Sequence, residues 1–110
     1  MCIALSGYIR TMQHMGGKLI RRDKDTRPDG VVIEIVIWEV DPAVLGSGHS
    51  YKYRLYAGRN GKTLVRYDNE TGKGDHKHQG DDEREAPFAF VSMQQTLRDF
   101  IREVDALTGE

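Results

Sequence analysis

The sequence contains a single cysteine, Cys2, so no disulfide can form within the chain. A small secreted scaffold held together by disulfides is therefore excluded. Long hydrophobic runs are also missing, because the longest, Val31 to Trp38, is interrupted by Glu34 and is far shorter than the ~20 residues that span a bilayer. Residues 1–14 lack the hydrophobic segment and small-residue cleavage site of a secretory signal. These absences predict a cytoplasmic protein with no membrane partner.

The chain has no large excess of charge of either sign. It carries 16 Lys and Arg against 17 Asp and Glu, which gives a formal net charge of -1. No global basic field attracts nucleic acid, so any such binding must come from a local patch. With 110 residues, of which 38% are hydrophobic and 30% charged, the composition predicts one globular domain.

The first residues show no clear periodicity, and a second possible start lies at Met15. We expect residues 1–16 to be an N-terminal extension, or a short helix that packs Ile9 and Met12 on the domain. Residues 17–110 are expected to form a single α+β domain.

Four segments are predicted to be strands: Lys18 to Asp23, Val31 to Val40, Tyr51 to Ala57 and Lys62 to Tyr67. The second has apolar residues on both of its faces, which is typical of a central strand covered on both sides. Asn60-Gly61 predicts a tight hairpin between the last two, because a type I′ turn needs positive φ at both positions.

This turn predicts a register in which Arg54 lies opposite Tyr67 and Lys52 lies opposite Asn69. Lys52, Arg54, Tyr56 and Tyr67 would then share one face of the hairpin. A slip of one residue would exchange the two faces.

The C-terminal segment is predicted to be a helix. Ser92 and Gln95 fit a capping box, and Gly109 is a plausible end. One apolar stripe recurs at helical spacing in Met93, Leu97, Phe100, Ile101, Val104 and Leu107. The predicted fold is thus a small antiparallel sheet of about four strands, packed by a C-terminal helix.

The polar stretch from Tyr67 to His78 concentrates titratable side chains between glycines. His76 and His78 point the same way if this piece is extended. Two adjacent imidazoles can act as acid and base in phosphodiester cleavage, or can bind one metal ion. A solvated polar loop is the simpler interpretation.

A metal site would need further ligands, for which Asp68, Asp75 and His49 are candidates. No HExxH, CxxC or similar spacing supports them. We therefore expect neither a metal nor another cofactor. The acidic residues near His78 are interpreted as a solvated loop (Asp81, Asp82, Glu83 and Glu85).

The segment from Tyr51 to Arg66 has no acidic residue and is rich in cations and tyrosines. Cations that contact phosphates and aromatic rings that stack on bases are what single-stranded RNA binding requires. Lys52, Arg54, Tyr56, Tyr67 and Asn69 are the predicted nucleic-acid-binding residues. An ordinary half-exposed strand, however, shows the same alternation.

The sequence resembles the TumE family, whose members are toxins of type II toxin–antitoxin pairs, usually beside a helix-turn-helix antitoxin. The resemblance covers about residues 17–107. It is carried by Pro28-Asp29-Gly30, Ile37-Trp38, Tyr51-Lys52-Tyr53, Tyr67-Asp68-Asn69-Glu70, Gly72-Lys73-Gly74-Asp75-His76-Lys77-His78 and the closing helix. It implies a toxin with such an antitoxin as partner, and RNA as a target by analogy with other toxins of such pairs.

The leading hypothesis is a metal-independent ribonuclease. His76 and His78 would exchange protons with the 2′-hydroxyl and the leaving oxygen, and Lys73 would stabilise negative charge in the transition state. Asp75 or Asp68 would orient an imidazole. The alternatives are a non-catalytic module that binds nucleic acid or protein, and a toxin that transfers a nucleotidyl group. A homodimer is a further expectation.

Overall fold

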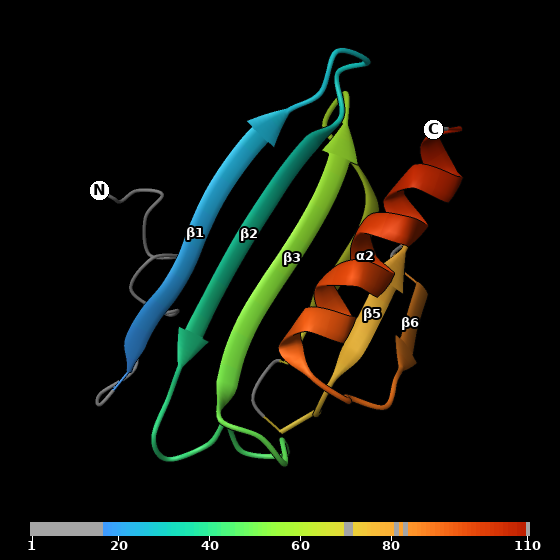
Figure 1. Cartoon of the computed structure of the whole chain (residues 1–110). Coiled ribbons are helices and arrows are strands. Elements are labelled where there is room, and N and C mark those ends of the chain that lie inside the picture. Colours follow the sequence, from blue (N-terminus) through green and yellow to red (C-terminus); the bar gives the residue numbers. More distant parts are fainter. Residues whose placement is uncertain (1–16, 70–71, 81, 83, 110) are drawn as a thin grey trace.

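The structure is a computed structural model that describes residues 17–69, 72–80, 82 and 84–109. The expected N-terminal extension or helix of residues 1–16 lies outside these ranges. The strands form one antiparallel six-stranded sheet in simple chain order, and a single helix covers one of its faces (Figure 1). This confirms the predicted α+β class, whereas the number of strands is six rather than about four.

The sheet runs from β1 at one edge to β6 at the other (Figure 1). The two strands that the sequence did not predict, β5 and β6, have four residues each and almost no apolar side chains, so they lack the alternation that indicates a strand. The elements are β1 Lys18–Thr26, β2 Val32–Glu39, β3 Tyr51–Arg59, β4 Lys62–Asp68, β5 His76–Gln79, β6 Arg84–Pro87 and α2 Met93–Thr108.

The hydrophobic core lies between the sheet and α2. Its fully buried members include Val31, Leu55, Ala57, Val65, Phe100 and Val104. On the opposite face of β2, Val36 is also buried. The second predicted strand is therefore covered in part on both faces, as its two-sided apolar pattern predicts.

Helix α2 begins and ends with the expected caps. The Ser92 hydroxyl accepts a hydrogen bond from the Gln95 backbone N–H at 3.0 Å, and Gly109 adopts a φ of 80°. The Gln95 side chain donates to Asp99 instead of returning to Ser92, so half of the capping box forms. No helix in the described ranges is long and apolar enough to cross a membrane.

The turn between β3 and β4 is the predicted one, with positive φ at Asn60 and Gly61. Beyond it, however, a bulge between Ala57 and Gly58 shifts the register by one residue, so Arg54 lies opposite Asp68 rather than Tyr67. The expected register was therefore wrong. Gly58 lies beside this bulge, and a Cβ there would lie 2.2 Å from the Tyr56 hydroxyl oxygen, so a larger residue would clash.

Candidate functional site

The two faces of the sheet differ in character. One face is covered by α2, and the other, which we call the open face, carries polar side chains from β4, β5 and β6. The strand register places Asp68 opposite His76, and His78 between Arg66 and Glu85. Because cross-strand partners point to the same side of a sheet, these side chains share the open face.

Asp68, His76, His78 and Glu85 converge into one group, which we call the histidine–carboxylate cluster. His76 Nε2 lies 2.9 Å from Asp68 Oδ1 and 3.1 Å from Glu85 Oε2, and His78 Nε2 lies 3.7 Å from Glu85 Oε2. The two imidazole rings meet edge to face at 4.9 Å. Asp68 and both histidines are buried, whereas the Glu85 side chain is 40% exposed and forms the solvent side of the cluster.

Neighbouring groups hold each member of the cluster in place. Arg66 Nε donates to Asp68 Oδ2 at 2.9 Å, which leaves Oδ1 directed at the histidines. Lys73 Nζ donates to Glu85 Oε2 at 3.2 Å, and this bond lowers the pKa of the Glu85 carboxyl. The cluster therefore contains fixed carboxylates with cations at its border.

Gly74 orients the ring of His76. Its backbone adopts a φ of 74°, and its carbonyl oxygen lies 3.0 Å from His76 Nδ1. A carbonyl can only accept, so Nδ1 is the protonated nitrogen. The other ring nitrogen, Nε2, faces the carboxylates.

The structure brings together three of the five predicted catalytic residues: Asp68, His76 and His78. Lys73 joins them through Glu85. Asp75 does not, because its carboxylate lies 2.9 Å from His49 Nε2 and accepts from the Tyr53 hydroxyl at 2.6 Å.

Asp75, His49 and Tyr53 form a separate network on the α2 side of the sheet. The Tyr51 backbone N–H donates to His49 Nδ1, so His49 Nε2 carries the proton and donates to Asp75. Phe90 stacks on the His49 ring with centroids 3.6 Å apart. Burial, followed by the bond to Asp75, raises the pKa of Tyr53. The two further metal ligands considered from the sequence, His49 and Asp75, thus pair with each other, away from His76.

The predicted nucleic-acid-binding residues divide between the two faces. Lys52, Arg54 and Tyr56 lie on the open face with Asp68. The Arg54 guanidinium is 5.0 Å from the centre of the Tyr56 ring and 3.7 Å from a Glu34 oxygen. Acidic residues are interleaved on this face, and a role of the three side chains in nucleic-acid binding stays a prediction.

Tyr67 and Asn69, the other two residues predicted to bind nucleic acid, do not lie on the open face. Tyr67 is buried against α2, where its hydroxyl donates to Glu103 at 2.6 Å, because the bulge turns it to that face. Asn69 is buried at the end of β4, where its Oδ1 accepts from the Tyr53 N–H and its Nδ2 donates to the Tyr51 carbonyl. Both side chains support the fold at these positions.

Glu85 and Arg66 complete the site but were not predicted. Glu85 was assigned to a solvated loop, yet it pairs with His78 across the β5–β6 hairpin. The available signal was Gly80, which adopts a φ of 81° between two short polar segments. A hairpin turn there would have placed Glu85 beside the histidines.

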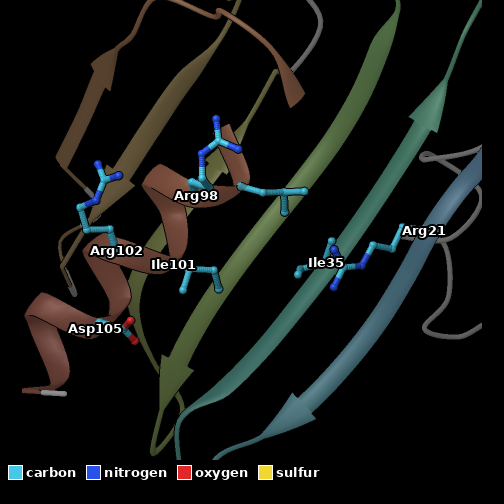
Figure 2. Close-up of a pocket in the computed structure, with 7 residues that line it drawn as sticks. Arg21, Ile35, Arg98, Ile101, Arg102 and Asp105 are labelled. Carbon is cyan, nitrogen blue, oxygen red and sulfur yellow. The ribbon is translucent and has the colours of Figure 1, made fainter. Parts of the chain in front are cut away.

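A hollow lies on the α2 side, between the helix and β1 (Figure 2). It measures about 460 Å³, and apolar side chains including Ile35 and Ile101 form part of its lining. Arg21, Arg98 and Arg102 surround it; Arg21 pairs with Asp23, and Arg102 with Asp99. This hollow is on the face of the sheet opposite to the histidine–carboxylate cluster.

Comparison with known protein families identifies the family of the chain. A family model described as "Toxin TumE" matches residues 12–108, which is most of the chain. Neither a curated protein nor a solved structure matches.

Proposed function

Since the chain belongs to the TumE toxin family, we propose that it is the toxin of a type II toxin–antitoxin pair and that it cleaves RNA at the histidine–carboxylate cluster. The observation that carries this proposal is the convergence of Asp68, His76 and His78 on one face of the sheet. Buried titratable groups with a specific charged neighbour are characteristic of functional sites. A solvated polar loop would not bury these side chains.

The open face also offers a surface for the substrate. Lys52, Arg54 and Tyr56 lie on β3, and Arg54 is the direct cross-strand neighbour of Asp68. Adjacent strands are ~4.8 Å apart, so a phosphate held by Arg54 lies close to the cluster. Cation and ring together suit a single-stranded RNA, whose backbone is anionic and whose bases stack on aromatic side chains.

The proposed reaction is an internal transesterification, in which the phosphorus exchanges its bond to the 5′-oxygen for a bond to the 2′-oxygen. The ribose 2′-oxygen loses its proton to a base and attacks the neighbouring phosphorus. The bond from phosphorus to the 5′-oxygen breaks, and that oxygen gains a proton. The products are a 2′,3′-cyclic phosphate and a 5′-hydroxyl, and Lys73 would stabilise the negative charge that develops on the phosphate.

The histidines can support this reaction in two ways. As direct acid and base they must contact the RNA, yet the Nε2 atoms of both rings are buried behind Glu85. As holders of a cation they need no such contact. The geometry favours the second way over the metal-free mechanism expected from the sequence.

Incubation of the purified protein with single-stranded RNA tests the proposal. We expect the wild type to cleave, His76→Gln to lose cleavage, and His49→Gln to retain it, since His49 belongs to the separate network. Because both variants replace a histidine by glutamine, a difference between them reports the position of the histidine and not the kind of substitution.

The other possible results contradict the proposal or change the role of the histidines in it. Binding of RNA without turnover, unchanged in His76→Gln, would indicate a non-catalytic binding module. Transfer of labelled nucleotide to RNA or protein would indicate a nucleotidyl-transferring toxin. Continued cleavage in EDTA, lost in His76→Gln, would keep the proposed reaction and return the proton roles to the histidines.

A partner follows from the same proposal. Toxins of type II pairs are held inactive by a protein antitoxin, and we infer a helix-turn-helix antitoxin here from the family resemblance.

A further inference from the structure

Three potential metal ligands from two adjacent strands meet on the open face. Asp68, His76 and His78 each present one ligand atom, and these atoms all lie within 4.8 Å of one another. A metal ion bound by nitrogen and oxygen at 2.0–2.2 Å holds neighbouring tetrahedral ligands about 3.3–3.6 Å apart, so the widest pair here must close by roughly 1.5 Å or less. The spacing therefore fits a single ion with small side-chain movements.

The tautomer of His76 directs the lone pair of Nε2 at two carboxylates. Because Nδ1 donates to the Gly74 carbonyl, the neutral ring has its lone pair on Nε2. That atom lies 2.9 Å from Asp68 Oδ1 and 3.1 Å from Glu85 Oε2. Acceptors this close repel one another unless a cation lies among them.

A second proton on His76 is the obvious alternative cation. An Nε2–H would then donate to Asp68 or Glu85. Among the residues that the structure describes, however, neither His76 Nε2 nor Asp68 Oδ1 has a partner in hydrogen-bonding geometry, although both atoms are buried. Buried polar atoms are rarely left without a partner, so these two atoms indicate a ligand.

We propose that Asp68, His76 and His78 bind one divalent ion of the first transition series, with Glu85 as a fourth ligand on the solvent side. Imidazole nitrogen is a ligand of Zn²⁺, Fe²⁺ and Ni²⁺, whereas Mg²⁺ and Ca²⁺ take oxygen. Two histidines and one carboxylate are a ligand set that sites for such metals use.

The groups behind the ligands match what metal sites require. Ligating histidines commonly donate their second ring nitrogen to a backbone carbonyl, and ligating carboxylates are themselves hydrogen-bonded. Gly74 supplies the carbonyl for His76, and Arg66 binds the second oxygen of Asp68. Both contacts fix the direction of the ligand atoms.

Calorimetric titration of the EDTA-stripped full chain with Zn²⁺ tests the site. The variants are made in a Cys2→Ser background, so that the thiol does not contribute. We expect one ion per chain, an affinity at least about 100-fold lower in His76→Gln, and little change in His49→Gln. An excess of Mg²⁺ should leave the titration unchanged.

Asp68→Asn provides a second variant, because it keeps the side-chain volume and an oxygen for Arg66. It should weaken Zn²⁺ binding while circular dichroism and the melting temperature show a folded chain. Absence of Zn²⁺ binding by the wild type overturns the inference. Equal binding by the wild type, His76→Gln and Asp68→Asn overturns it as well.

The use of this ion in RNA cleavage rests on the proposed function, whereas its binding does not. Stoichiometric Zn²⁺ binding by a protein that leaves RNA intact would support the metal site and contradict the proposed reaction. Cleavage of RNA in EDTA by a protein that binds no Zn²⁺ would do the opposite.

Discussion

In His49 both ring nitrogens have partners: Nδ1 accepts from the Tyr51 N–H, and Nε2 donates to Asp75. In His76, within the described part of the chain, only Nδ1 has a hydrogen-bond partner, and Nε2 faces two carboxylates. Spacing along the sequence could not separate these two environments, because each depends on residues from other strands. The neighbours of each ring therefore decide which histidine supports the fold and which belongs to the site.

Tyr53 provides a prediction for pH dependence at the scale of one residue. Burial and the bond to Asp75 raise its pKa, so its contribution to stability is complete below the unfolded pKa of ~10 and is lost as the pH rises above that value. Tyr53→Phe should cost roughly 1.5–3 kcal/mol at pH 8, because a bond to a charged acceptor is lost. It should also flatten the alkaline fall in stability.

Urea unfolding of both proteins between pH 8 and pH 11 measures this difference. The same alkaline slope in wild type and Tyr53→Phe would contradict the role given to this hydroxyl.

At the scale of elements, one acidic residue of α2 joins the helix to two strands. Glu103 accepts from the Tyr67 hydroxyl at 2.6 Å, from Lys77 Nζ at 3.2 Å and from Gln79 Nε2 at 2.5 Å. These contacts lie beside Phe100 and Val104, which fill the core beneath the helix. Glu103 thus adds polar contacts at the edge of an apolar interface.

We expect Glu103→Ala to lower the free energy of unfolding by roughly 2–3 kcal/mol, because three donors lose a charged acceptor. Arg102→Ala is the control, since Arg102 is exposed and its loss should change stability by less than about 0.5 kcal/mol. Thermal or urea unfolding of both variants gives the comparison. Similar losses in the two variants would show that these bonds do not hold the helix.

The elements also show how far sequence patterns extend. The apolar periodicity of α2 and β2 and the Asn60-Gly61 turn were predicted because each depends on local residues. The bulge beside Gly58 was not, since a shift in the pairing of β3 with β4 leaves no mark in the local alternation of apolar and polar residues. That single shift reversed the faces of β4 and moved Tyr67 into the core and Asp68 to the open face.

The histidine–carboxylate cluster was predicted only in part, because some of its members come together through local spacing and others through the sheet register. His76 and His78, two residues apart, share a face because β5 is extended, which was the condition on which this expectation rested. Glu85 reaches them only through the β5–β6 hairpin, whose polar strands carry no hydrophobic signal. Ligands that come from separate strands require the sheet register, which the sequence did not determine.

At the scale of the whole molecule, the two faces of the sheet hold different groups of side chains. The α2 face holds the core, the Tyr53 network and Glu103, on which stability depends. The open face holds the histidine–carboxylate cluster beside Lys52, Arg54 and Tyr56. Substitutions in the cluster should therefore impair activity more than folding, which makes a test in living cells interpretable.

Induced expression in a bacterial host, comparing the wild type with the His76→Ala/His78→Ala double variant, tests most directly whether the cluster is the site of toxicity. The account predicts growth arrest by the wild type and normal growth with the double variant at equal soluble levels. Equal arrest by both proteins would contradict it, because the toxicity would then arise elsewhere on the molecule.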